Sequence, residues 1–126
     1  MEKPIILLID DDPMSNVFGS IIIKKNNPNY NVIPLNSAVE AIAYLKDETK
    51  TNPKLIFLDL NMPVMNGWEF LDEYRKLNLS INIVLLTSSS SLEDIIKSQE
   101  YIEIKQYFLK PITNDTLKQV VSLIEK

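Results

Sequence analysis

The sequence predicts an α/β fold in which five parallel strands form one doubly wound sheet, with helices on both faces. Two observations support this prediction. Short apolar runs alternate five times with segments of helical spacing along the 126 residues. The clearest runs are apolar almost throughout, as in strands that are covered on both faces. Right-handed crossovers then give a doubly wound sheet, for which a common strand order is 2-1-3-4-5, and the length fits a single domain spanning residues 1–126.

Five segments are expected to form the strands. They are residues 5–9, 31–35, 55–58, 81–86 and 107–109. Segment 31–35 has the weakest apolar character and contains Pro34, which lacks the N–H that an interior strand must donate. The proline therefore favours an edge position, and the order 2-1-3-4-5 makes the second strand an edge.

Apolar residues recur at helical spacing in the segments between and after these strands. The five sets are Met14, Val17, Phe18 and Ile21; Ala38, Ala41, Ile42 and Leu45; Phe70, Leu71 and Tyr74; Leu92, Ile95 and Ile96; and Leu117, Val120, Val121 and Ile124. This spacing is typical of amphipathic helices, whose apolar stripe ordinarily faces the core. We therefore expect one helix after each strand.

Residues that can cap helices stand where these helices should begin. Ser37 and Ser91 are each followed three residues later by an acidic residue, as in a capping box. Thr113 can cap the last helix. Asp12 precedes Pro13, and proline suits the first position of a helix. We therefore interpret Asp12 as the N-cap of the first helix.

The composition excludes several classes of protein. The net charge is -4, from 13 basic and 17 acidic residues without a basic block, which argues against nucleic acid or an anionic membrane as a partner. No segment approaches the roughly 18 apolar residues of a membrane span, and the first apolar run is too short for a signal peptide. Cysteine and histidine are both absent, which removes disulfides, thiolate metal sites and the commonest general base. A cytoplasmic location is expected.

Acidic residues follow the first and third expected strands. Asp10 and Asp11 end the first strand and Asp59 ends the third. These two strands are neighbours at the topological switch point of the sheet, where ligands bind. Three neighbouring carboxylates require a cation or raised pKa values, and a site made only of oxygen ligands suits Mg²⁺. The acids alone leave a second interpretation open, in which Asp10 and Asp11 only solvate a loop.

Two further side chains at strand ends favour a phosphoryl site. Thr87 ends the fourth strand and Lys110 ends the fifth. A hydroxyl donor and an ammonium group that face the acids and a metal ion could bind phosphoryl oxygens. Asp59 could then act as a nucleophile that forms an aspartyl phosphate. Taken singly, Thr87 could be a strand-end hydroxyl bonded to backbone and Lys110 a surface lysine. These separate interpretations do not explain why all five residues occur together at the strand ends.

Four motifs, taken in order, resemble a known family. They are LLIDDDP, LIFLDLNMPVMNGWEFL, LLTSS and YFLKP. Together they are similar to the response-regulator receiver domains of two-component signalling, and the likeness covers essentially the whole chain. The sequence of the second motif resembles that of stand-alone regulators of the chemotaxis-regulator type. The resemblance implies a flavodoxin-like version of the fold expected above.

The resemblance also implies a role for each acid. Asp59 would be the phosphoacceptor. Asp10, Asp11 and Asp59 would bind the cofactor Mg²⁺ together with the backbone carbonyl of Asn61.

The remaining positions of the family pattern are implied in the same way. Thr87 and Lys110 match the phosphoryl-sensing hydroxyl and the phosphoryl-binding lysine, and Tyr107 matches an aromatic switch position. The bond between Lys110 and Pro111 matches one that is cis in the family. The fourth helix departs from the pattern, because many receivers carry Gly-Ala before the last strand where this chain has EYIEIKQY. Gly67 is expected in the turn before the third helix.

The resemblance implies a signalling module rather than an enzyme. A sensor histidine kinase or a histidine phosphotransfer protein would supply the phosphoryl group in a Mg²⁺-dependent transfer. The surface of the fourth helix, fifth strand and fifth helix would then change its affinity for a downstream protein or for a second copy of the chain. The chemistry expected of the chain itself is phosphorylation from phosphodonors and dephosphorylation.

Two other classes of function fit the sequence less well. A phosphohydrolase of the haloacid-dehalogenase type needs a second acid two residues after its nucleophile, and that position here is Asn61. No general acid is then in place. A docking module that works without phosphorylation would have no use for Thr87 and Lys110 facing the acids. The complete set of five residues favours the phosphoacceptor.

Overall fold

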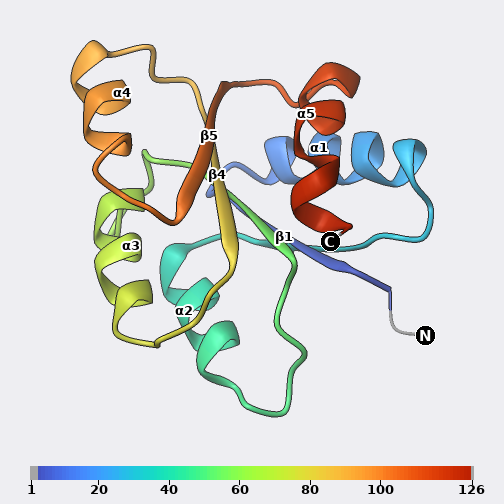
Figure 1. Ribbon diagram of the computed structural model, residues 1–126, viewed down its shortest axis with the longest axis horizontal. Helices are drawn as coiled ribbons and strands as arrows, with labels where there is room; N and C mark the ends of the chain where they lie inside the picture. The colour runs from blue at the N-terminus through green and yellow to red at the C-terminus, as the bar shows by residue number, and fades with distance from the viewer. Residues whose placement is uncertain (1–2, 126) are drawn as a thin grey trace.

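A computed structural model describes residues 3–125 and confirms the predicted fold class. Five parallel strands form one sheet in the order β2-β1-β3-β4-β5, and a helix follows each strand (Figure 1). The strands are β1 (Ile5–Ile9), β2 (Asn31–Leu35), β3 (Leu55–Leu58), β4 (Asn82–Thr87) and β5 (Ile104–Leu109). The helices are α1 (Pro13–Asn26), α2 (Ala38–Lys46), α3 (Gly67–Arg75), α4 (Leu92–Ser98) and α5 (Asn114–Ile124).

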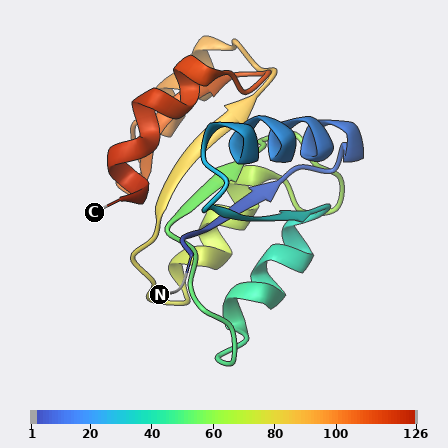
Figure 2. The same ribbon diagram turned by 90° about the vertical axis from the view of Figure 1, so that its right-hand side faces the viewer.

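The sheet separates two layers of helices. Helices α2, α3 and α4 lie on one face, while α1 and α5 lie on the other (Figure 1). Figure 2 shows α1 and α5 from the side on which they cover the sheet. Each face has its own apolar core, because alternate residues of β1 point to opposite sides: Leu7 and Ile9 pack with α2 and α3, and Ile6 and Leu8 pack with α1 and α5.

Strands β1, β2 and β3 follow the predicted boundaries, and β4 and β5 do not. Every residue of β3 is buried, and Pro34 lies in β2, at one edge of the sheet, as expected. Strand β5 begins at Ile104, three residues before the predicted start. It is the other edge strand and exposes Lys105 and Gln106, so its first half carries no unbroken apolar signal. Strand β4 begins one residue later than expected and extends to Thr87.

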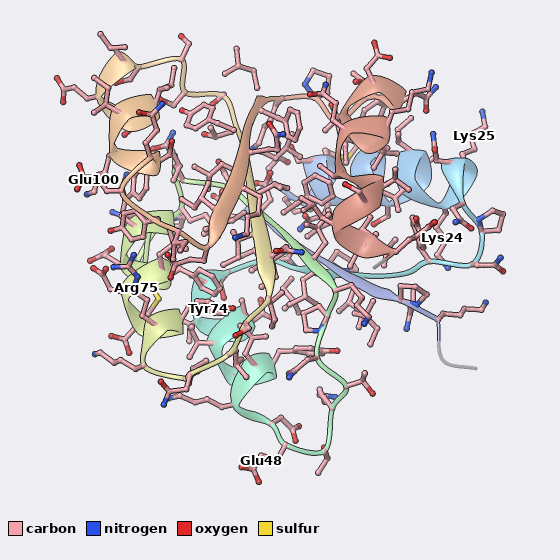
Figure 3. The ribbon with its side chains drawn as sticks, viewed as in Figure 1. Lys24, Lys25, Glu48, Tyr74, Arg75 and Glu100 are labelled. Carbon is pink, nitrogen blue, oxygen red and sulfur yellow. The ribbon has the colours of Figure 1, made fainter. Side chains whose placement is uncertain are left out.

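The apolar stripes of α2 and α3 face the core as their spacing predicts. All four predicted residues of α2 are buried, and so are all three of α3. Figure 3 shows Tyr74 on the side of α3 that faces the sheet, with Arg75 on its outer side. The hydroxyl of Tyr74 accepts a hydrogen bond from the backbone N–H of Ile81 at 2.7 Å. This bond ties α3 to the start of β4.

Helix α1 turns the opposite face to the sheet from the one its apolar stripe indicates. The buried residues of α1 are Asn16, Gly19 and Ile23. The residues of the expected stripe are exposed instead, namely Met14, Val17, Phe18 and Ile21. The reason is close approach: a Cβ atom on Gly19 would lie only 3.1 Å from Cδ1 of Leu8. The small residue lets α1 lie against β1, and the larger apolar residues of the helix face solvent.

Helices α4 and α5 also differ from their predicted stripes. In α5, Leu117, Val120 and Ile124 are buried, but Val121 is exposed. In α4, Leu92 and Ile96 are exposed and the buried residue is Ser98.

The segment after α4 is attached to α3 through aromatic and charged side chains. The ring of Trp68 lies 5.5 Å from the ring of Tyr101. Arg75 lies over Tyr101 and forms two hydrogen bonds with Glu103. The end of α4 was the boundary expected to depart from the family pattern, and these contacts fix the segment that follows it.

The predicted caps are confirmed. Side-chain oxygens of Asp12, Ser37, Ser91 and Thr113 accept hydrogen bonds from backbone N–H groups in the first turns of α1, α2, α4 and α5. Helix α3 has a capping box between Asn66 and Glu69 that the sequence analysis missed. Within residues 3–125, no helix is long and apolar enough to cross a membrane.

Candidate functional site

The carboxyl ends of four neighbouring strands bring the predicted site residues to one edge of the sheet. Asp10 follows β1, Asp59 follows β3, Thr87 ends β4 and Lys110 follows β5. Backbone hydrogen bonds continue between the strands at this edge. The N–H of Asp59 donates to the carbonyl of Ile9 at 3.0 Å, and the N–H of Lys110 donates to the carbonyl of Thr87 at 2.9 Å. The strand order therefore sets the positions from which the four side chains extend.

Three carboxylates meet at the centre of this edge. One oxygen from each of Asp10, Asp11 and Asp59 lies within 4.8 Å of the other two. Asp10 and Asp59 are 6% and 4% exposed, and Asp11 is exposed to solvent. Three oxygen donors at this spacing, with one open side, fit a hard divalent cation that keeps several of its waters. The chemistry of the donor set therefore suits Mg²⁺ or Mn²⁺.

The third aspartate after β1 has a different role, as expected. The carboxylate of Asp12 accepts a hydrogen bond from the N–H of Met14 at 3.0 Å and caps α1. Its own N–H donates to Oδ1 of Asp10 at 3.0 Å. Asp12 therefore supports the acid cluster without being one of its three members.

Lys110 lies between the two buried acids. Its Nζ is 2.6 Å from Oδ2 of Asp10 and 3.4 Å from Oδ2 of Asp59. Burial alone would lower the pKa of Lys110, but the hydrogen bond to Asp10 and the charges of both acids outweigh it and raise the pKa. The ammonium group stays charged at neutral pH and compensates part of the negative charge in the crevice.

Asp59 is the acid whose environment opposes ionisation. Burial raises the pKa of Asp59 above its ordinary value, and the charge of Asp10 raises it further. Lys110 and the N–H of Asn61, which donates to Oδ1 of Asp59 at 3.4 Å, act in the opposite direction. Perturbed carboxylates beside a lysine in a cleft are typical of reactive sites.

Thr87 and Tyr107 are linked through a residue that the sequence analysis missed. Thr87 is fully buried, and its hydroxyl accepts a hydrogen bond from the N–H of Ser89 at 3.2 Å. The hydroxyl of half-buried Tyr107 donates to the carbonyl of the same serine at 2.6 Å. The side chain of Ser89 donates to Asp94 in the first turn of α4 at 2.6 Å. Ser89 thus joins the end of β4, the edge strand and α4.

Two further expectations concern the backbone next to the site. The Lys110–Pro111 peptide bond is cis. Gly67 is not a turn residue, which corrects the expectation: it is the first residue of α3, after the N-cap Asn66. A Cβ atom there would lie 2.8 Å from the carbonyl oxygen of Asp59. Glycine is needed because α3 starts against the backbone that carries Asp59.

Asn16 is a second residue of the site region that the sequence analysis missed. It lies on the buried face of α1, and its side-chain amide donates to the backbone carbonyl of Asp10 at 2.9 Å. The spacing of apolar residues directed attention to the other face of the helix. The pattern that could have found it is the small and polar face of Asn16 and Gly19.

The chain matches one family model over nearly its whole length. The model of the response regulator receiver domain matches residues 6–122. Among curated proteins, the chain is 40% identical over 95 residues to the nitrate/nitrite response regulator protein NarL of Escherichia coli, covering 75% of this chain and 43% of that protein. It is 30% identical to response regulator Rcp1 of Synechocystis sp. over 127 residues, covering 96% of this chain and 86% of that protein. The chain therefore spans less than half the length of NarL.

Solved structures show the same fold. A two component response regulator from Cytophaga hutchinsonii superposes with a TM-score of 0.87 at 27% identity, covering 98% of both chains. The Mn²⁺-bound form of Rcp1 superposes with a TM-score of 0.78 at 29% identity, covering 98% of this chain and 96% of that one.

Proposed function

This chain belongs to the response regulator receiver domain family, and from that premise we propose that it is a phosphoacceptor switch in which Asp59 takes a phosphoryl group from a phosphorylated histidine. The observation that supports this most is the placement of Asp59 beside Asp10 and within 3.4 Å of the Lys110 ammonium group. The proposal takes residues 1–126 as one receiver domain of a two-component signalling pathway.

In the proposed transfer, a carboxylate oxygen of Asp59 attacks the phosphorus atom. The new O–P bond forms as the N–P bond to the donor histidine breaks, and the imidazole leaves with its electron pair and takes up a proton. The Lys110 ammonium group would shift toward the oxygens of the transferred phosphoryl group, which carry the negative charge. Its Nζ already contacts Asp59 and Asp10. The hydroxyl of Thr87 would donate to one phosphoryl oxygen. No general acid is required for the leaving imidazole, because water can supply the proton.

A divalent cation fits the acid cluster, and we assign Mg²⁺ as its usual occupant. Asp10, Asp11, Asp59 and the backbone carbonyl of Asn61 would hold it. When bound, the ion supplies positive charge that offsets the charge on the phosphoryl oxygens. Asp10 and Asp59 are the two residues that Lys110 and the ion would share.

The proposed donor is a histidine kinase or a histidine phosphotransfer protein, and α1 offers a surface for it. The exposed apolar stripe Met14, Val17, Phe18 and Ile21 begins three residues after Asp11. A donor that reaches Asp59 must cover the carboxyl edge of the sheet, from which α1 starts. Burying this stripe would remove apolar surface from water as the donor docks.

The proposed output surface lies on α4, β5 and α5. Addition of a phosphoryl group brings about two negative charges to Asp59. Thr87 would turn toward that group and give up its bond with Ser89, which also holds Tyr107 and the start of α4. The exposed Leu92 and Ile96 of α4 would then change position. A downstream protein or a second copy of the chain would read this change as a shift between two packings.

The switch is tested by NMR with beryllofluoride and Mg²⁺, which mimic the phosphoryl group. We expect shifts of signals in the crevice and also of Tyr107, α4 and α5. Thr87→Ala should still bind beryllofluoride but show weaker distant shifts. Full distant shifts in Thr87→Ala would contradict a route through Thr87, and shifts confined to the crevice of the wild type would contradict the switch.

A further inference from the structure

The buried face of α1 carries one polar side chain that is aimed at the acid cluster. Asn16 is only 3% exposed. Its Nδ2 lies 2.9 Å from the backbone carbonyl of Asp10, 3.0 Å from Oδ1 of Asn36 and 3.4 Å from the carbonyl of Leu35. Because the two backbone carbonyls can only accept hydrogen bonds, the orientation of the Asn16 amide is determined by its surroundings. One side chain of α1 thus joins the ends of β1 and β2.

Asp10 depends on this side chain because its strand has already ended. Strand β1 stops at Ile9, so the carbonyl of Asp10 lies beyond the ladder of β1. The N–H of Asp10 still reaches the carbonyl of Leu35 at 3.1 Å. The carbonyl of Asp10 is held by Asn16 instead. With its N–H, its carbonyl and both carboxylate oxygens engaged, Asp10 has one orientation.

The space behind the acids is bounded by the same residue. A cavity of about 20 Å³ is lined by Asn16, Asp10, Asp59 and Gly19, among others. This volume is close to the minimum that holds one water molecule. A side chain that fills the place of Asn16 without donating a hydrogen bond would leave the carbonyl of Asp10 unpaired next to this cavity. Asp10 could then rotate toward it and away from Asp11 and Asp59.

We propose that Asn16 is a positioning residue for the divalent-cation site, acting through the backbone of Asp10. The inference rests on the proposed function, because it concerns the same acid cluster. Residues that orient metal ligands from behind typically change metal affinity by about 10- to 100-fold when they are replaced. Asn16 does not touch the ion or the phosphoryl group, so its effect is on the affinity for the ion and not on the reaction that follows.

The test compares two asparagines of α1 that both join this helix to a neighbour. Asn16→Leu removes the amide beside Asp10 and keeps the number and branching of the side-chain heavy atoms. Asn26→Leu is the control, since Asn26 bonds to Oδ1 of Asn114 at 2.8 Å near the far end of the helix. Calorimetric titration with MgCl₂ of protein shown to be folded by circular dichroism should give a dissociation constant raised about tenfold or more in Asn16→Leu. Asn26→Leu should match the wild type.

A second readout separates positioning from general loss of structure. With acetyl phosphate as donor, Asn16→Leu should need about tenfold more Mg²⁺ for half-maximal phosphorylation, yet reach the rate of the wild type at saturation. A variant that is merely less well folded would lose rate at every Mg²⁺ concentration. Should Asn16→Leu fail to fold, Asn16→Ala replaces it, because alanine also lacks a side-chain donor and demands no new packing.

The outcomes distinguish this inference from the proposed function. Wild-type affinity in a folded Asn16 variant, with Mg²⁺ binding intact in the wild type, would overturn the inference alone. An equal loss in Asn26→Leu would also overturn it. A wild-type protein that binds no Mg²⁺ would overturn the proposed metal site and the inference together.

Discussion

Helices α1 and α2 cover opposite faces of the sheet, and both carry apolar residues at positions i, i+3, i+4 and i+7. In α2 these residues form the buried face, and Ile42 is 7% exposed. In α1 the same pattern faces solvent, and Ile21 is 55% exposed. The face of α1 that meets the sheet consists of Asn16, Gly19 and Ile23. Equal spacing therefore led to opposite orientations.

An apolar stripe on a surface helix does not by itself identify the face that meets the sheet. A helix buries the face that fits its neighbour, and α1 lies so close to β1 that a Cβ atom on Gly19 would be only 3.1 Å from Cδ1 of Leu8. Asn16 is retained on that face because it bonds to Asp10. The apolar stripe is then left exposed, next to the acid cluster. In α2 no site competes for the inner face, and the stripe serves the core.

The largest effect is expected for a matched pair of isoleucines. Ile42→Ala should lower the free energy of unfolding by about 2–5 kcal/mol, because it leaves a cavity in the core. Ile21→Ala should change it by no more than about 0.5 kcal/mol, as for exposed positions in general. Urea denaturation measures both. Similar losses at the two positions would contradict the orientation of α1.

The start of α1 offers a second contrast, between neighbouring aspartates. Mg²⁺ should raise the melting temperature of the wild type, because the ion binds the folded acid cluster and not the unfolded chain. Asp11→Asn should remove most of this rise, since Asp11 is a member of the cluster. Asp12→Asn should keep it, because asparagine caps a helix about as well as aspartate. Equal losses in the two variants would show that Asp12 contributes to the cation site as much as Asp11 does.

A smaller effect is expected when the exposed stripe of α1 is cut back. Phe18→Ala should leave stability within about 0.5 kcal/mol of the wild type. It should weaken use of a phosphorylated protein donor by roughly fivefold to tenfold, the loss of an apolar anchor at an interface. Phosphorylation by acetyl phosphate is the control and should be unchanged. A parallel loss with acetyl phosphate would place Phe18 in the crevice chemistry rather than in docking.

The smallest effect is expected for Gly19→Ala. Alanine there gains about 1 kcal/mol of helix propensity but brings a Cβ atom to 3.1 Å from the end of the Leu8 side chain. These contributions should nearly cancel, so Gly19→Ala should differ from the wild type by less than about 1 kcal/mol. Gly19→Val is the sharper variant and should destabilise clearly, since its branches meet the sheet. A stable Gly19→Val variant would mean that α1 is not held close to β1.

Most of the fold and the acid cluster could be predicted from the sequence for a physical reason. Strands covered on both faces are apolar throughout, so their ends are visible, and parallel strands bring their carboxyl ends to one edge. This placed Asp10, Asp59, Thr87 and Lys110 at the same edge in advance. The start of β5 was missed because Lys105 and Gln106, exposed on this edge strand, interrupt its apolar run.

The remaining details depend on distances that no periodicity encodes. The burial of Asn16 follows from the closeness of α1 to the sheet. The need for glycine at position 67 follows from the backbone of Asp59 lying against α3. The link through Ser89 follows from the path of the loop after β4. Each is a contact between segments that are remote in the sequence or irregular in structure.

The central claim is that Asp59 accepts the phosphoryl group, and mass spectrometry tests it most directly. Asp59→Asn is a fair control, because the pKa of Asp59 is raised by burial and by Asp10. An acid with a raised folded pKa costs stability once the pH passes that pKa, so its replacement by a neutral amide should not unfold the protein at pH 7.

The measurement is the intact and peptide mass after incubation with acetyl phosphate and Mg²⁺. We predict one added phosphoryl group in the wild type, in the peptide that contains Asp59, and none in Asp59→Asn. An adduct that persists in Asp59→Asn, or one that maps to Asp10 or Asp11, would contradict the account.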